Sequence, residues 1–130
     1  MNYETEKDYI LRLIKEVVRT LTSLVLGRKY SQEELLPEDR YGISHDSYEQ
    51  VKGMVDRGEV NEAENILLDE LDAARNESVA KLIFFYEYAS GKGDVFLKQH
   101  QYSMEEVLEG LKMLADKLGY QNVIDMMDIY

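Results

Sequence analysis

His45 and His100 are the only histidines of the chain, and histidine is the residue type that most often binds metals or moves protons near neutral pH. Neither has a second ligand at helical spacing, because no His-Glu-x-x-His or Glu-x-x-His pattern occurs. Asp and Glu are plentiful, yet no segment has the Asp-x-Asp-x-Asp-Gly order of a calcium loop. The sequence therefore predicts no metal site, and both histidines are interpreted as surface or capping residues.

Two short segments contain the residue types used in phosphate binding and in nucleophilic catalysis. Residues 90–94 place glycines beside a lysine, but the upstream glycine and the preceding strand of a phosphate-binding loop are missing. Residues 44–47 read Ser-His-Asp-Ser, but neighbours at a helix start point in different directions and commonly cap the helix. Acidic pairs such as Glu62 and Glu70 are most simply a solvated helix face. We therefore expect a binding protein rather than an enzyme, with no cofactor.

Composition limits the class of protein further. The 130 residues include no cysteine, which excludes disulfides, thiol nucleophiles and thiolate metal sites. A net charge of −11 repels nucleic-acid backbones and anionic lipid, and no apolar run approaches the roughly 18 residues of a membrane span. The acidic, polar start is the reverse of a signal peptide. We expect a cytoplasmic protein that forms one domain over residues 1–130 and binds neither nucleic acid nor membrane.

The longest amphipathic pattern runs from Glu4 to Lys29 and predicts a long N-terminal helix. At 100° per residue its apolar side chains span an arc of roughly 160°, and they are Ile10, Leu13, Ile14, Val17, Val18, Leu21, Leu24 and Val25. The opposite arc holds Arg12, Lys15, Glu16, Arg19, Thr22 and Ser23. The apolar arc is wider than one neighbour needs, so it either covers two helices of its own domain or leaves one edge for a second copy of the chain.

The remaining pattern predicts an all-α fold of five to six helices, built from antiparallel hairpins packed with the N-terminal helix. A turn of helix over residues 31–36 should stop at Pro37, and residues 38–42 should form a loop. Helices over residues 44–57 and 60–74 should form a hairpin, with Leu71 and Ala74 among the core positions. Residues 79–89 are apolar on all sides, which predicts a buried central helix. Residues 94–101 are ambiguous, and helices over residues 103–118 and from Gln121 onward complete the domain.

Residues 44–75 resemble one tetratricopeptide-type repeat. Gly58, Val60, Ala63 and Leu67 stand where that repeat has its turn glycine, its turn aromatic, its small contact residue and a large core residue. Val60 replaces the aromatic, and residues 90–102 interrupt the next hairpin.

Two further similarities involve shorter segments. Residues 30–36 match residues 102–108 at five of seven positions, and we interpret both as helix starts that obey the same capping rule. Residues 8–14, with the order of the helices, resemble a family of small, uncharacterised, tetratricopeptide-like bacterial proteins. That resemblance implies a right-handed array or bundle of helical hairpins, and it brings no catalytic residues.

Two candidate binding surfaces follow. Arg12, Lys15 and Arg19 form a basic ridge on the outer face of the first helix, which could dock an acidic protein or peptide, or a second copy in a homodimer; the alternative is a solvated face paired with neighbouring acids. The second surface is a small-molecule pocket covered by residues 90–102. Its expected lining is Tyr86, Tyr88, His100 and Tyr102.

Overall fold

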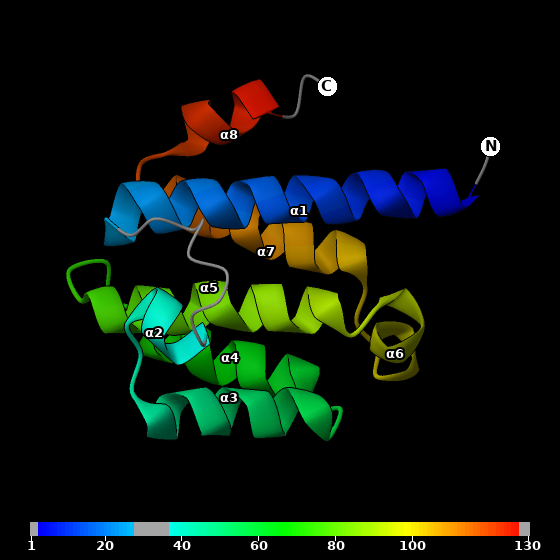
Figure 1. Ribbon diagram of the computed structural model, residues 1–130, viewed down its shortest axis with the longest axis horizontal. Coiled ribbons are helices and arrows are strands. Elements are labelled where there is room, and N and C mark those ends of the chain that lie inside the picture. Colours follow the sequence, from blue (N-terminus) through cyan, green and yellow to red (C-terminus); the bar gives the residue numbers. More distant parts are fainter. Residues whose placement is uncertain (1–2, 28–36, 128–130) are drawn as a thin grey trace.

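Residues 3–27 and 37–127 are described by the computed structural model, with side chains over 8–27 and 39–127, and this part of the chain is helical apart from its turns (Figure 1). Its eight helices are α1 (Tyr3–Leu26), α2 (Pro37–Tyr41), α3 (His45–Asp56), α4 (Val60–Glu70), α5 (Asn76–Gly91), α6 (Asp94–Gln99), α7 (Met104–Lys117) and α8 (Gln121–Met127). The all-α prediction is confirmed. The number of described helices exceeds the expected five to six because the short segments α2 and α6 are also helical.

The proline at position 37 begins a helix. Pro37 is the first residue of α2, where a residue without an N–H fits because the first N–H groups of a helix have no intrahelical partner. The predicted loop over residues 38–42 is therefore wrong. The turn of helix predicted for residues 31–36 lies outside the described residues.

Helix α1 lies across two helices of its own domain, α5 and α7. Its buried side chains are Leu13, Ile14, Val17, Val18, Leu21 and Thr22. Most of the wide apolar arc therefore covers two neighbours, but Leu24 of the same arc is 45% exposed, so the arc also leaves an edge uncovered. Thr22 was expected on the solvent side, but it is buried because its hydroxyl donates to the Val18 carbonyl oxygen at 2.7 Å.

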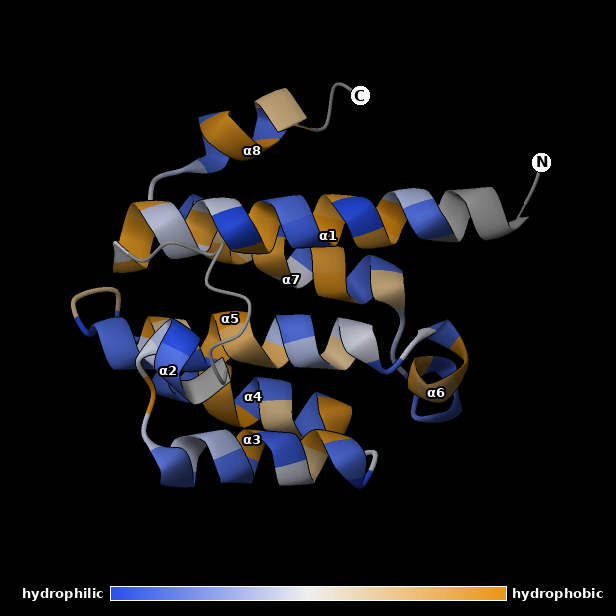
Figure 2. Cartoon of the chain, in the orientation of Figure 1, coloured by the Kyte–Doolittle hydropathy of each residue, from blue (hydrophilic) through white to orange (hydrophobic). Residues whose placement is uncertain are grey.

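Helix α5 is the central helix of the domain, as its apolar sequence predicts. It packs against α1, α2, α3, α4 and α7, and the bulky side chains from Leu82 to Tyr86 are all at most 1% exposed. In Figure 1, α1 and α7 lie on one side of α5, and α3 and α4 lie on the other. The hydropathy colouring of Figure 2 places apolar residues on the faces of the outer helices that point toward this centre.

The turn between α3 and α4 has the glycine that the hairpin prediction requires. Gly58 adopts φ +85°, a left-handed conformation that glycine reaches at little cost. The two helices pack against each other on either side of this turn, and the predicted core residues Val60, Ala63 and Leu67 are buried.

The second helix of this hairpin is shorter than predicted. Helix α4 ends at Glu70, and Ala74 is exposed rather than in the core. The Ser78 hydroxyl accepts a hydrogen bond from the Asp72 N–H at 3.0 Å and lies 2.9 Å from the Asp72 carbonyl oxygen. These local side-chain bonds replace the helical ones and end the helix early.

The last two helices follow the sequence pattern closely. Ser103 caps α7 by accepting the Glu106 N–H at 3.1 Å, the capping box that the sequence indicates. Helix α8 packs against α7 through Ile124, which is 1% exposed. In Figure 1, α8 lies beyond α1, on the side of the domain opposite to α3.

Candidate functional site

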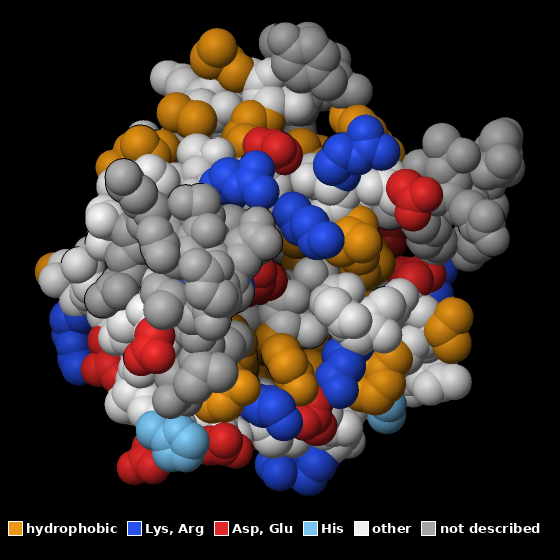
Figure 3. Space-filling view, viewed as in Figure 1, with side chains coloured by type: hydrophobic (Ala, Val, Ile, Leu, Met, Phe, Trp, Pro, Cys, Tyr) orange, Lys and Arg blue, Asp and Glu red, His pale blue; other side chains and the backbone are white. Residues whose placement is uncertain are grey.

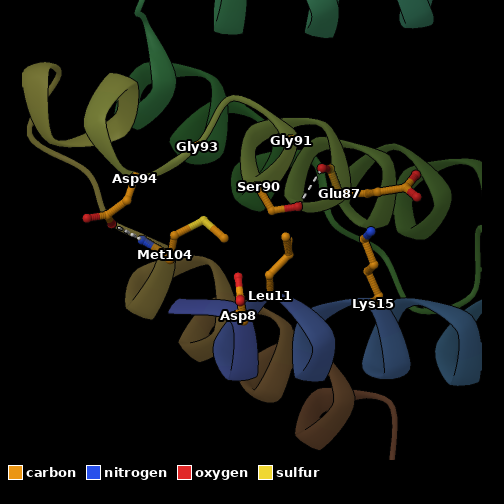
Figure 4. A pocket seen from close by; sticks show the side chains of 9 residues that line it. All are labelled: Asp8, Leu11, Lys15, Glu87, Ser90, Gly91, Gly93, Asp94 and Met104. Carbon is orange, nitrogen blue, oxygen red and sulfur yellow. Dashed lines mark hydrogen bonds between the residues drawn. The ribbon is translucent and has the colours of Figure 1, made fainter. Parts of the chain in front are cut away.

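A hollow of about 490 Å³ lies where α1 passes the junction of α5, α6 and α7 (Figure 4). It is lined by Asp8, Leu11 and Lys15 from α1, by Glu87, Ser90 and Gly91 from α5, and by Gly93, Asp94 and Met104. This volume is in the range of small-ligand pockets and of clefts that hold a few side chains of a partner. The lining combines two long apolar side chains with charged groups on both walls.

Two of the three carboxylates in the hollow are already engaged. The Glu87 carboxylate accepts a hydrogen bond from the Tyr41 hydroxyl and lies 3.6 Å from the Arg40 guanidinium. Asp94 pairs with the Lys98 ammonium at 3.1 Å and lies 3.5 Å from the Met104 N–H. Both groups therefore hold the walls of the hollow in place.

Asp8 and Lys15, the two charged residues that α1 contributes to this hollow, are not engaged in this way. Among the described residues, neither Asp8 nor Lys15 forms an ion pair or a hydrogen bond. Lys15 points from α1 toward the α5 wall in Figure 4, and both side chains belong to exposed residues. Their charges are thus available to a molecule that enters the hollow.

A second hollow, of about 400 Å³, lies on the other side of the last turn of α5. Its lining is Arg40, Phe84, Glu87, Tyr88, Gly91 and Lys92. Glu87 and Gly91 line both hollows, so the two meet across the end of α5. Gly91 has no side chain to separate the two hollows, and a Cβ there would extend into open space, with nothing within 4 Å.

The predicted basic ridge exists as an exposed surface. Arg12, Lys15 and Arg19 are all exposed, and Lys and Arg side chains gather along α1 on the face shown in Figure 3. Arg19 pairs with Glu16 at 3.5 Å, with both side chains about half exposed, as the solvated alternative expected. Lys15 borders the hollow of Figure 4, and Arg12 borders a third hollow on the opposite side of α1.

The four residues predicted to line a pocket form two separate groups. In the first, Tyr86 and Tyr102 are buried beside the Glu64 carboxylate. The Tyr86 hydroxyl donates to Glu64 at 2.6 Å, whereas the Tyr102 hydroxyl has no hydrogen bond of ordinary length to a described residue. Burial and the Glu64 charge raise the pKa of both phenols well above the usual value. This group belongs to the core.

The second group joins α3 to the end of α5. The Asp56 carboxylate accepts a hydrogen bond from the Tyr88 hydroxyl at 2.6 Å and pairs with Lys92 at 2.6 Å. The Lys92 ammonium also lies 5.4 Å from the Tyr88 ring centre and 5.2 Å from that of Phe96. The centre of the His100 ring lies 4.7 Å from the centre of the Phe96 ring.

Of the four predicted residues, only Tyr88 lines one of these two hollows. The hollow of Figure 4 does lie at the predicted segment, but residues 90, 91, 93 and 94 line it instead of the aromatic residues. Sequence reasoning missed Asp8, Glu87 and Met104. One signal was present for Glu87, since it is the only acid within the apolar run from Val79 to Ala89.

A model of a protein family matches residues 4–119, which extend from α1 to the end of α7. The chain belongs to DUF6483, a family of unknown function. Every residue that lines the two hollows is inside the matched region, whereas α8 follows it. No curated protein and no solved structure matches the chain.

The other chemistry-bearing residues of this DUF6483 chain have ordinary surroundings. His45 is exposed and lies 3.9 Å from Glu49, while Ser44 caps α3 by accepting the Ser47 N–H at 3.1 Å. Glu62 is exposed, and Glu70 pairs with Lys81 at 3.1 Å. Over the described ranges, no three His, Asp or Glu side chains are grouped as metal ligands would be. Within the same ranges, no helix has the length and apolarity needed to cross a bilayer.

The Asp56 group makes the stability of the DUF6483 domain depend on pH. Hydrogen bonds from Lys92 and Tyr88 lower the pKa of Asp56 to about 2, below the ordinary 3.8. A carboxylate with a lowered folded-state pKa stabilises the fold above its unfolded pKa, and that contribution is lost as the pH falls from about 4 to 2.

We expect Asp56→Asn to lower the free energy of unfolding at pH 7 by about 1 kcal/mol, since a side chain that is one-third exposed is partly screened. Urea unfolding of both proteins between pH 7 and 2 measures the difference, which should shrink at the acid end. A difference that stayed constant with pH would contradict the role of this carboxylate.

Proposed function

We propose that this chain is a cytoplasmic, non-enzymatic protein–protein interaction module, and that the hollow between α1 and the end of α5 receives an acidic segment of a partner protein. Lys15 carries this proposal. It is an exposed cation without an ion pair among the described residues, in a chain of net charge −11, at the edge of a hollow with apolar side chains. Such a combination favours a segment that brings one carboxylate to Lys15, a hydrogen-bond donor to the Asp8 carboxylate, and one or two apolar side chains.

We further propose that the helices form a bundle of tetratricopeptide-like hairpins, with α3 and α4 as one such hairpin. The turn glycine Gly58 and the buried Val60, Ala63 and Leu67 support this, since small side chains let paired helices approach closely. Helical-hairpin proteins present binding surfaces formed by several helices, and α1 with α5 provides such a surface here.

The test replaces Leu11, which lies in the hollow, by a photo-crosslinking amino acid in the living host cell. We expect a discrete adduct to one protein, reduced at least about fivefold when Lys15→Glu is added, because the cation that meets the acidic segment is then reversed. Mass spectrometry of the adduct identifies the partner and the crosslinked segment.

Two controls make the crosslinking result specific. The same crosslinker at Val95, which is 74% exposed and outside the hollow, should give no such adduct. Lys117→Glu on α7 changes the net charge equally and should leave the Leu11 adduct unchanged. An adduct that Lys15→Glu leaves intact, or none at all from Leu11, would rule out this surface.

A second candidate function is a small-molecule-binding protein, or an enzyme acting on such a molecule, with its pocket near residues 90–102. The observation that favours it is the volume of the same hollow, about 490 Å³, with Ser90, Gly91, Gly93 and Asp94 on one wall. A thermal-shift screen of metabolites separates the candidates. A ligand whose stabilisation is abolished by Leu11→Trp, which fills the hollow, would favour the small-molecule function.

A further inference from the structure

The side of α1 that faces α8 presents an apolar hollow of about 310 Å³, separate from the hollow discussed above. Tyr9, Leu13 and Met127 line it, with Arg12 and Glu16 beside them. Tyr9 remains 40% exposed. Apolar surface of this kind, bordered by charges, is characteristic of contact sites between proteins.

Helix α8, which contributes Met127 to the hollow, has further exposed apolar side chains. Val123 lies one turn before Met127 and is 37% exposed, and Met126 is 68% exposed, although the same helix is anchored by the buried Ile124. Exposed methionine adapts readily to an opposing surface because its side chain is unbranched and polarisable. The hollow that Tyr9 and Met127 line, with the exposed Val123 and Met126 on the same short helix as Met127, is therefore suited to burial against another protein.

The charges beside this hollow are ordered so that the same face of a second copy can pair with them. Tyr9, Arg12, Glu16 and Arg19 are spaced three or four residues apart, so they form one stripe along α1. When two such helices run antiparallel with Arg12 opposite Glu16 of a second copy, Glu16 also meets Arg12 of that copy. The same register places Tyr9 opposite Arg19, because Tyr9 precedes Arg12 by three residues and Arg19 follows Glu16 by three.

We propose that a second copy of this chain packs antiparallel on this stripe, as a twofold symmetric homodimer. Each contact then occurs twice, giving two Arg12–Glu16 ion pairs and two Tyr9–Arg19 cation–π contacts around the apolar hollow. A uniformly acidic partner fits less well, since it would meet Arg12 but oppose the Glu16 carboxylate. The parallel arrangement would place like charges opposite each other.

The present ion pairs of the stripe leave it able to form these contacts. Arg12 has no ion pair among the described residues. Glu16 and Arg19 pair at 3.5 Å within the helix, but their side chains are 52% and 53% exposed, and exposed pairs of this spacing are weak. Exchanging this pair for the Arg12–Glu16 pair across a partly dry interface costs little for Glu16, while Arg19 keeps its further interaction within its own chain.

Charge exchange tests the register. Sedimentation equilibrium of the wild type is expected to show a dimer at micromolar concentration. Arg12→Glu should weaken dimerisation at least about tenfold, because the new carboxylate at position 12 then faces Glu16 of the other copy at both contacts. Glu16→Arg should weaken it similarly, because two arginines then face each other at both contacts. The double variant Arg12→Glu with Glu16→Arg should restore the wild-type dissociation constant, since the pairs re-form with reversed polarity.

Arg57→Glu serves as the matched control, because Arg57 is an exposed residue at the end of α3, on the side of α5 away from α1, and this change should leave the dimer intact. Circular dichroism shows whether each variant keeps its helix content. A monomeric wild type at all concentrations overturns the proposal, and so does a double variant that fails to recover while remaining folded. Neither result affects the proposed function, which depends on Lys15 and the hollow beside α5.

Discussion

Replacing Gly110 by valine is expected to lower the free energy of unfolding by about 3 kcal/mol. Gly110 is a buried residue of α7, and a Cβ there would lie 2.4 Å from the Cε1, Cζ and hydroxyl oxygen of Tyr86. Tyr86 has little room to move, because it is 1% exposed, donates to Glu64 and packs edge-on against Phe85 at 5.1 Å between ring centres. The added atoms must therefore push α7 away from α5.

Alanine at position 110 separates this clash from helix propensity. It gains about 1 kcal/mol as a better helix former, against an overpacking cost of about 1 to 3 kcal/mol, so the net loss is smaller than for valine. Gly53→Ala on α3 is the matched control, because its Cβ would meet only the mobile guanidinium of Arg57 at 3.2 Å. Urea unfolding of the three variants provides the values. A Gly110→Val domain as stable as the wild type would contradict the contact between α7 and Tyr86.

The second large effect is expected at Gly58, where alanine should lower the free energy of unfolding by about 2 kcal/mol. About half comes from the left-handed conformation at φ +85°, which a Cβ makes unfavourable. The remainder comes from His100, whose ring atoms would lie 2.3 Å from that Cβ. Unlike Tyr86, His100 is only partly buried, so its ring can rotate toward solvent and lose its contact with Phe96.

A double-mutant cycle divides the Gly58 effect into its two parts. In a background carrying His100→Ala, the cost of Gly58→Ala should fall to about 1 kcal/mol, because only the backbone strain remains. The coupling free energy between the two positions is then about 1 kcal/mol. Strictly additive effects would show that the imidazole does not lie over this turn.

These two glycines illustrate what the sequence can and cannot predict. The hairpin turn at Gly58 follows from local pattern alone, because a glycine between two amphipathic segments indicates a left-handed turn. The position of His100 over that glycine does not follow, since it depends on a contact far apart in the sequence, in which the Asn61 side chain of α4 donates to the carbonyl oxygens of residues 100 and 101. Gly110 has no local signal at all, because its role is set by the Tyr86 ring of another helix.

The central helix was the most predictable element. A segment that is apolar on every side requires neighbours on every side, and α5 has them. The one acidic residue between Val79 and Ala89, Glu87, marks the point where two hollows meet and where Tyr41 and Arg40 approach from α2. Their position depends on the path of the chain after Pro37, where the sequence predicted a loop and the structure has α2.

The candidate site was predictable only in its location. The glycines at positions 91 and 93 indicate an interruption of the helical order, and the hollow lies there. Its chemistry depends on where α1 crosses this junction, and no local pattern encodes that crossing. The aromatic residues nearby belong instead to the core or to the Asp56 group, because a large ring is stabilised most by burial.

The contacts of α5 have a consequence for how the domain can be divided. Repeat arrays in which each unit touches only its neighbours tend to unfold stepwise and tolerate removal of end units. Here α1 and α7 share one side of α5 while α3 and α4 share the other, so neither pair keeps its apolar face covered once α5 is removed. We therefore expect the described helices to unfold together, and a fragment that omits α5 to lack the core around which the outer helices pack.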